Sequence, residues 1–373
     1  MSGSDNFDVV ILGGGMAGVS LAATLAPSCR VAVLEREPRP GMHATGRSAA
    51  LYAPGYGAGP IRRLTKASAE TFFAPNAEVP LVRPRATLLV ATDAQLPLLE
   101  RMLADDPTLF ERIDGAAAER LMPILRPGMV AAALLDRSSA DIDVDALLQF
   151  YLRQLRARGG EIRTEAAPTA LTAEDGGWTV STAAGDLRGR VLVNAAGAWA
   201  DEAAALAGIR PLGMSPMRRT AALVDAPAME GFADWPAVID IGETFYFKPD
   251  AGKLLVSPAE ETACTPHDAY ADDMALAEGI ERIMQLTTLS VDRLPRSWAG
   301  LRTFAPDRVP VIGFSNHAPA PFFWLAGQGG YGIQTAPAAA MLAAWLIAGG
   351  ERPDVADDAL VAALAPARLE AAA

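Results

Sequence analysis

Three glycines near the start of the chain have the spacing that lets a backbone wrap around a phosphate. Gly13, Gly15 and Gly18 fit the pattern G-x-G-x-x-G, after the apolar run Asp8–Leu12 and at the start of the predicted helix Ala17–Ala26. The first glycine allows a tight turn, the second admits a pyrophosphate, and the third lets helix and strand pack closely. The helix N-terminus adds free N–H groups and partial positive charge. The segment therefore predicts a dinucleotide-binding βαβ unit.

Glu35 is placed to complete this unit. It follows the second predicted strand, Arg30–Leu34, where an acidic side chain can accept a hydrogen bond from a ribose hydroxyl. A lone glycine motif is a weak signal, and a glycine-rich turn in another βαβ unit is the alternative. The strand before the motif, the helix after it and the acid beyond them favour dinucleotide binding. The motif does not separate NAD from FAD.

Two further predicted strands end in small residues. Ala196 and Gly197 follow the strand Arg190–Asn194, and a glycine run follows the strand Phe322–Leu325. Small residues directly after a strand let the backbone approach a ligand. A plain glycine turn before the apolar helix at 336–348 is the alternative for the second site.

The composition indicates a globular protein that binds small molecules. The chain has 373 residues, of which 51% are apolar and 20% charged, with a net charge of −12. This acidic balance, with no dense Lys/Arg run, argues against a nucleic-acid or anionic-membrane surface. Cys29 and Cys264 have no metal or redox spacing, which suits a reducing compartment. We expect a cytoplasmic enzyme with no signal peptide, no transmembrane segment and no metal site.

The order of the predicted elements indicates a fold of two interleaved parts. Strand–helix–strand patterns occur at the N-terminus, in the middle and near the C-terminus, with antiparallel-looking strands between them. The prediction is an α/β fold with a Rossmann-like dinucleotide domain assembled from separate segments, 1–78, 136–207 and 305–373. An α+β substrate domain with a mainly antiparallel sheet would come from 79–135 and 208–304.

Three stretches together resemble the D-amino acid oxidase superfamily of FAD-dependent oxidoreductases. They are the N-terminal fingerprint, VNAAGAWAD at 193–201 and LAGQGGYGIQTAPA at 325–338. Within this superfamily the chain resembles the bacterial FAD-dependent D-arginine dehydrogenases. The shared segments include ATGRSAA at 44–50, FYFKPDAG at 245–252 and WAGLR at 298–302. The likeness covers nearly the whole chain.

This resemblance implies noncovalently bound FAD. The residues implied for the ADP half are Gly13, Gly15, Met16, Ala17, Gly18, Glu35 and Arg36. Those implied for the pyrophosphate and flavin are Thr45, Gly46, Arg47, Ser48, Ala49, Ala50, Ala196 and Gly197. Those implied beside the isoalloxazine ring are Gly329, Gly330, Tyr331, Gly332, Ile333 and Gln334. In some relatives, the dimethylglycine dehydrogenases, a histidine in surroundings like those of His43 carries the flavin covalently; here a structural or hydrogen-bonding role is favoured.

The resemblance also implies an amino acid substrate. A carboxylate in a buried apolar pocket must be paired, and the planar fork of arginine suits it. The residues implied for this site are Arg219 and Arg302 for the carboxylate, Tyr246 and Tyr56 as hydroxyl partners, and Gln334 and Gly330 beside the amine or carboxylate. A surface salt bridge is the alternative for either arginine. The expected reaction is hydride transfer from Cα to flavin N5, with Tyr56 or water as the base for the amine.

Two positions bear on the side chain of the substrate. Leu51 stands where the D-arginine dehydrogenases have a histidine, and Thr87, in the predicted strand Leu81–Ala91, stands where they have a glutamate. Loss of that glutamate disfavours a basic substrate, so we expect D-amino acids with neutral, apolar side chains. The electrons would pass to oxygen, a quinone or another carrier.

Other functions remain open from the sequence. A glycine, sarcosine or N-methyl amino acid oxidase of the same superfamily is one alternative. A flavoprotein subunit or tRNA-modification module is another, which the acidic charge opposes. An NAD-dependent dehydrogenase is opposed by the C-terminal segment at 325–338.

Overall fold

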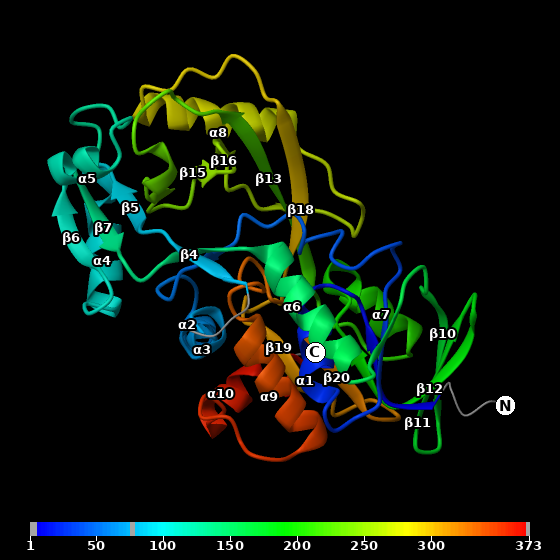
Figure 1. The fold of residues 1–373 in the computed structure, drawn as a ribbon. Helices are drawn as coiled ribbons and strands as arrows, with labels where there is room; N and C mark the ends of the chain where they lie inside the picture. The colour runs from blue at the N-terminus through cyan, green and yellow to red at the C-terminus, as the bar shows by residue number, and fades with distance from the viewer. Residues whose placement is uncertain (1–5, 75–78, 371–373) are drawn as a thin grey trace.

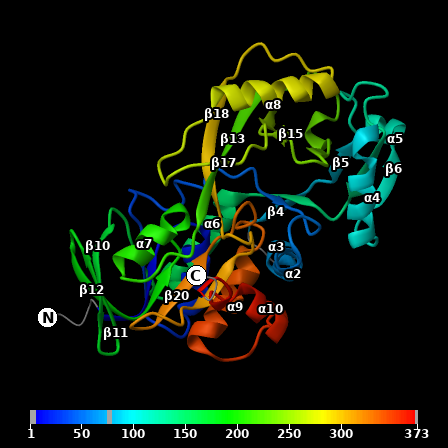
Figure 2. The same ribbon diagram turned by 180° about the vertical axis from the view of Figure 1, so that it is seen from behind.

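The computed structural model describes residues 6–74 and 79–370. Two parts of the predicted dinucleotide domain, 1–5 and 75–78, and the last three residues of the chain lie outside the described residues. Figures 1 and 2 show two sheets arranged one above the other, with helix α8 over the upper sheet and helices α9 and α10 beside the lower one.

The lower sheet contains the βαβ unit that the sequence predicts, as β1, α1 and β2. Its strands are β1 (Asn6–Leu12), β2 (Val31–Leu34), β9 (Glu161–Arg163), β10 (Pro168–Glu174), β11 (Gly177–Thr182), β12 (Gly185–Asn194), β19 (Val311–Phe314) and β20 (Phe322–Ala326). Strands β9, β2, β1, β12 and β20 are neighbours in that order and all parallel. Both faces of this parallel core are buried, which explains why β1 and β2 read as continuous apolar runs.

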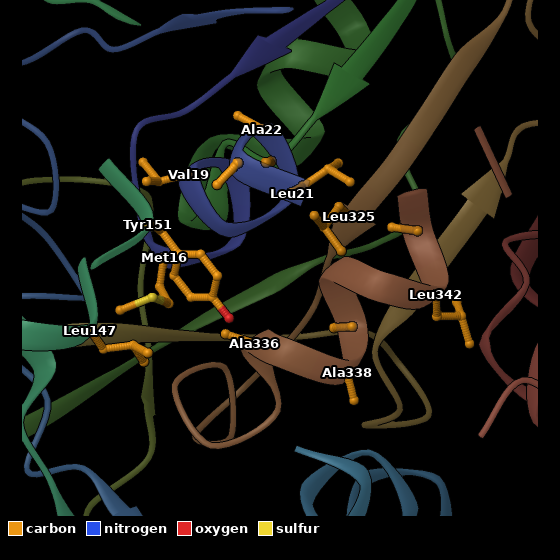
Figure 3. Packing of buried hydrophobic residues seen from close by; sticks show 14 of the residues in the cluster. Met16, Val19, Leu21, Ala22, Leu147, Tyr151, Leu325, Ala336, Ala338 and Leu342 are labelled. Carbon is orange, nitrogen blue, oxygen red and sulfur yellow. The ribbon is translucent and has the colours of Figure 1, made fainter. Parts of the chain in front are cut away.

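Helices cover one face of this sheet. Figure 3 shows α1 (Met16–Leu25), α6 (Val144–Ala157) and α9 (Ala336–Ala348) bringing Val19, Tyr151 and Leu342 into one cluster. The other face packs against α7 (Ala200–Leu206). The predicted helix Ala17–Ala26 is therefore confirmed, one residue earlier at each end.

The upper sheet is mainly antiparallel. Its strands are β5 (Thr87–Ala91), β6 (Glu111–Asp114), β7 (Ala132–Asp136), β13 (Ser215–Asp225), β14 (Ala237–Asp240), β15 (Tyr246–Asp250), β16 (Lys253–Ser257), β17 (Thr262–Ala263) and β18 (Arg296–Phe304). Only the β5–β14 pair is parallel among its described pairs. Helices α5 (Gly115–Leu121) and α8 (Asp273–Leu286) pack on one face and α4 (Leu96–Asp105) on the other.

The predicted strand Leu81–Ala91 is wrong as a single element. It divides into β4 (Val82–Pro84), which joins a small sheet with β3 (Leu51–Tyr52) and β8 (Ala140–Ile142), and β5 in the upper sheet. Pro84 has no N–H to continue a ladder. The guanidinium of the next residue, Arg85, is bonded to Asp141 and to the Trp235 carbonyl, which turns the chain between the sheets.

Short elements complete the described chain. They are α2 (Gly59–Ala67), α3 (Ala69–Phe72), α10 (Asp358–Leu364), α11 (Ala367–Glu370), and the single-turn helices η1 (Asp93–Gln95), η2 (Gly197–Trp199) and η3 (Phe232–Asp234). Within residues 6–74 and 79–370, the helices are all too short or too polar to cross a bilayer.

The strands of the lower sheet all come from the segments predicted for the dinucleotide domain. Those of the upper sheet come from the other two segments, except that β7 ends at Asp136, one residue past the predicted limit. The small sheet mixes the two, since β4 comes from one set and β3 and β8 from the other. The exact domain limits stay a prediction.

Candidate active site

A cavity of about 410 Å³ lies where the two sheets meet. Its floor is formed at the carboxyl ends of β1, β2 and β12, by Leu12, Glu35 and Ala195. Ligands of open parallel sheets bind at this edge. Its roof is formed by β13, β15 and β18 of the upper sheet, which contribute Arg219, Tyr246 and Arg302 among others. Residues from both sheets therefore face one space.

The glycine fingerprint forms the tight part of this floor. Gly13 has φ of +108°, and a Cβ there would lie 2.4 Å from the Ala195 carbonyl oxygen. A Cβ on Gly18 would lie 2.0 Å from the Gly13 carbonyl oxygen, so this glycine is needed for packing and lies outside the cavity lining. Met16 N–H donates to Thr45 Oγ1 at 3.0 Å, which ties the fingerprint to the loop that follows β2. Gly15, Met16 and Ala17 line the cavity as predicted for cofactor-binding positions.

Glu35 is buried at the end of β2 and faces the same space. Its Oε2 accepts from Gly14 N–H at 2.8 Å and its Oε1 from Glu37 N–H at 2.9 Å. Each carboxylate oxygen has a second lone pair, so the group can still accept from a ribose hydroxyl. Next to it, the Arg36 guanidinium lies 4.8 Å from the ring of Trp199, a cavity residue at the end of the predicted AAGAW segment.

Only some residues of the loop after β2 line the cavity. Thr45, Arg47 and Ser48 line it, whereas Gly46, Ala49 and Ala50 do not. The Arg47 guanidinium does not face the cavity as a free group, because it donates to the carbonyls of Met42, Ala269 and Ala299 and pairs with Asp268. Its bonds join the dinucleotide loop to β18 and the segment before α8.

His43 also lines the cavity, and it is engaged with protein groups. Its Nε2 lies 2.9 Å from Glu37 Oε1, and its ring is 4.7 Å from that of Trp199. His267, on a loop of the upper part, lines the same cavity, as do Thr303 and Gln328. Gln328 lies within the 325–338 segment that carries the resemblance but was not singled out, whereas His267 and Thr303 have no distinct signal in the sequence.

The two arginines predicted for a carboxylate are neighbours in the structure. Strand β18 pairs with β13 so that Gly300 faces Arg219 and Arg302 faces Met217. Arg219 and Arg302 are therefore diagonal neighbours on one face of the sheet. Gly330 lies against the second arginine, since a Cβ there would be 2.8 Å from Arg302 Nη1. Tyr246 of β15 lines the same end of the cavity.

The two guanidinium groups differ in their partners. Arg219 is buried, with Nε donating to the Glu260 carbonyl at 2.7 Å and Nη2 to Glu261 Oε1 at 3.0 Å. Arg302 has no hydrogen bond or ion pair with any residue in the described part of the chain. A guanidinium that lines a cavity without a partner is available for an anionic ligand.

The pKa values of the two arginines are shifted by burial and by the charged and phenolic groups around them. The pKa of Arg219 is lowered, first by burial and then by the charge of Arg302. Burial acts in the same direction on Arg302, but three nearby phenols, Tyr246 foremost, together with the Glu261 carboxylate outweigh it and raise the pKa of Arg302.

Tyr56 and Tyr331 belong to this group, although neither lines the cavity. Their rings lie 5.0 Å apart, and Tyr56 donates to Glu243 Oε2 at 3.2 Å. Burial raises the pKa of Tyr56 far above its ordinary value, with Glu243 adding to the effect. Its phenol therefore stays protonated near neutral pH, which fits a hydrogen-bond donor better than a base.

Three other predicted substrate contacts lie outside the cavity lining. Gln334 is buried and accepts from Ala53 N–H at 3.1 Å, while its Nε2 has no partner among the described residues. Leu51 pairs with Asp141 in the small sheet. Thr87 is buried in β5, and its Oγ1 has no partner among the described residues. The remaining predicted positions, Ala196, Gly197, Gly329, Gly332 and Ile333, do line the cavity.

Curated relatives of the chain are named for several different activities. Mitochondrial dimethylglycine dehydrogenase of Homo sapiens is 25% identical over 88% of this chain and 41% of that protein. Hydrogen cyanide synthase subunit HcnC of Pseudomonas aeruginosa is 25% identical over 82% of this chain and 84% of that one. D-amino-acid oxidase of Streptomyces coelicolor is 28% identical over 69% and 71%. The chain thus spans less than half the length of the dimethylglycine dehydrogenase.

Solved structures share the fold over almost the full chain. L-proline dehydrogenase from P. horikoshii has a TM-score of 0.85 at 21% identity, with 98% of each chain covered. Glycine oxidase from Geobacillus kaustophilus has a TM-score of 0.82 at 20% identity, with 94% of this chain and 96% of that chain covered. The family model of FAD-dependent oxidoreductases, DAO, matches residues 8–346. The chain therefore belongs to the DAO family of FAD-dependent oxidoreductases.

Proposed function

We propose that this protein binds FAD noncovalently in the cavity and oxidises a D-amino acid with a neutral side chain. The products would be a 2-oxo acid and ammonia, formed when the imine is hydrolysed. The observation that carries the proposal is Arg302, a guanidinium that lines the cavity without a partner in the described part of the chain.

The cavity suits FAD by its shape and by its polar atoms. Gly13 and Gly18 leave no room for a Cβ, which keeps the turn and the helix of the fingerprint tightly packed. Gly15 lines the cavity without a side chain, so a pyrophosphate can approach the backbone there. Thr303 Oγ1 and Gln328 Nε2 are buried cavity atoms with no partner in the described residues. Glu35 would hold the ribose, and the Gly329–Ile333 segment would lie beside the isoalloxazine ring. When bound, FAD supplies the acceptor for the hydride that leaves Cα.

The residues of the roof would hold and orient the substrate. Arg302 would bind the carboxylate in a bidentate pair, and the Tyr246 hydroxyl would add a hydrogen bond. This fixes Cα in one position, which is the main contribution that a protein makes to hydride transfer. Since the pKa of Tyr56 is raised, water is the better candidate for accepting the amine proton, and Tyr56 would act as a donor.

The charges around the arginines favour a neutral side chain. The acidic cavity-lining residues, Glu35 and Glu202, lie at the dinucleotide end, directly after β2 and on α7. A substrate guanidinium would be an unpaired buried cation, which costs several kcal/mol. Burying a Leu-sized side chain gains about 1.5–3 kcal/mol.

We therefore expect kcat/KM for D-leucine or D-methionine to exceed that for D-arginine by at least about tenfold. Steady-state assays with an artificial dye acceptor test this, with the L-isomers as controls. A preference for D-arginine would contradict the side-chain assignment, and a preference for L-isomers the stereochemical one.

A second candidate is oxidation of glycine or an N-methylated glycine. The match to dimethylglycine dehydrogenase over 88% of this chain favours it. Arg302 would bind the carboxylate in either case, so the side chain and the N-methyl groups, and not the carboxylate, separate the two. Adding glycine, sarcosine and dimethylglycine to the same panel decides between them, because only the second candidate predicts that one of these three is preferred over D-leucine.

The flavin is expected to be released intact when the purified yellow protein is denatured. His43, the histidine considered for covalent attachment, is hydrogen-bonded to Glu37 and packed on Trp199. Acid precipitation followed by absorption spectra of pellet and supernatant measures this. Flavin that stays with the precipitated chain would contradict noncovalent binding, and its loss in a His43→Ala variant would identify the attachment site.

A further inference from the structure

Glu261 is a carboxylate of the protein held against one of the two substrate-site arginines. Its Oε1 lies 3.0 Å from Arg219 Nη2, and its Oε2 lies 2.8 Å from Arg308 Nη2. Arg308 is half-exposed, and its guanidinium carbon lies 3.9 Å from the centre of the Phe304 ring. The carboxylate therefore bridges a buried arginine of the cavity and a half-exposed arginine outside the cavity lining.

The segment that carries Glu261 is fixed to β13. The neighbouring Glu260 accepts Thr220 N–H through Oε1 at 2.6 Å, and its carbonyl accepts from Arg219 Nε. One residue later, β17 pairs with Met217 and Arg218 of β13. These bonds hold the backbone on both sides of Glu261, so its carboxylate is kept at Arg219 and is not a freely moving surface group.

The charges at this end of the cavity can then be counted. Arg219, Arg302 and the half-exposed Arg308 bring three positive charges, and the carboxylates of Glu261 and Glu260 bring two negative ones. The pKa of Arg219 is lowered by burial and then by Arg302, with Tyr246, Tyr56 and Glu261 acting in the opposite direction. Glu243 lies on an exposed turn and is bonded to Tyr56, so it does not pair with either arginine. One positive charge is left for a ligand.

We propose that Glu261 is a positioning residue that occupies Arg219 as an internal carboxylate and restricts the site to substrates with a single carboxylate. A monocarboxylate on Arg302 brings the group to neutrality. A second carboxylate would be buried beside Glu261 with no cation left to pair it, which is costly in a low-dielectric site. This inference rests on the proposed role of Arg302, and it adds a rule for the charge of the substrate.

The test compares dicarboxylates with their mono-amides in the FAD-loaded protein. Dissociation constants for glutarate and glutaramate are measured from the change in the flavin absorption spectrum, which needs no turnover. In parallel, kcat/KM is compared for D-glutamate and D-glutamine. Glu261→Gln should shift both ratios toward the dicarboxylate by at least about tenfold. Glu261→Ala should act in the same direction and replaces the first variant if that does not fold.

The matched control is Glu281→Gln, which removes the same charge from the exposed surface of α8. It should leave both ratios unchanged. A shift below about twofold in Glu261→Gln, or an equal shift in the control, would overturn the proposal. So would a wild-type protein whose flavin spectrum responds to neither ligand, since Arg302 would then not be accessible. Absence of turnover with any D-amino acid, together with the expected binding ratios, would instead reject the proposed function and keep the role of Glu261.

Discussion

Replacing Arg302 by alanine is expected to lower kcat/KM by about 30- to 4000-fold while FAD remains bound. The guanidinium lines the cavity without a partner among the described residues, so the substrate carboxylate would be its counter-ion. Truncating one partner of a buried charge pair costs about 2–5 kcal/mol, and about 1.4 kcal/mol corresponds to a tenfold change. Steady-state kinetics and the flavin absorption of the purified variant measure the two parts of this expectation.

Two further variants make the test specific. Arg302→Lys keeps the charge but loses the planar fork, so an intermediate loss is expected. Arg296→Ala removes an arginine from the exposed start of the same strand and should leave kcat/KM unchanged. If Arg302→Ala retains FAD and stays within about threefold of wild-type activity, the carboxylate binds elsewhere.

The dinucleotide half of the site could be predicted because its signals are local. The strand, glycine turn and helix at Asn6–Leu25 are consecutive, and each glycine has a steric reason that the sequence pattern encodes. Glu35 could be predicted from the same short unit, because it comes directly after the second strand. The prediction that Arg219 and Arg302 lie in one site depended on resemblance. Strands β13 and β18 are far apart in the chain, and only their register makes these residues neighbours.

Contacts between distant segments account for what the sequence did not reveal. The guanidinium of Arg47 has three of its partners, Asp268, Ala269 and Ala299, more than 200 residues away, so a side chain that lines the cavity also joins two parts of the fold. Glu261 lies in a segment without regular pattern, and only the structure places it at Arg219. Thr87 lies outside the cavity lining, in β5 beyond the turn at Arg85, whose guanidinium pairs with Asp141.

Next to the turn at Arg85, one carboxylate, that of Asp141, pairs with two buried cations. Asp141 Oδ1 accepts from Lys248 Nζ at 2.6 Å, and its Oδ2 pairs with Arg85. The Arg85 and Lys248 side chains are 4% and 6% exposed, so water can do little to solvate either charge. Asp141 belongs to β8 of the small sheet and Lys248 to β15 of the upper sheet. The cluster therefore fastens the two sheets together.

Asp141→Asn is expected to lower the free energy of unfolding by about 3–5 kcal/mol, because it leaves two buried cations without a carboxylate. Lys248→Met removes one of the cations instead and keeps the balanced Asp141–Arg85 pair, so its loss should be clearly smaller. Urea titrations of both variants, with the slopes compared to wild type, measure the difference. Equal losses in the two variants would mean that each residue acts by packing alone. A larger loss for Lys248→Met would show that the charge balance at Asp141 does not hold the two sheets together.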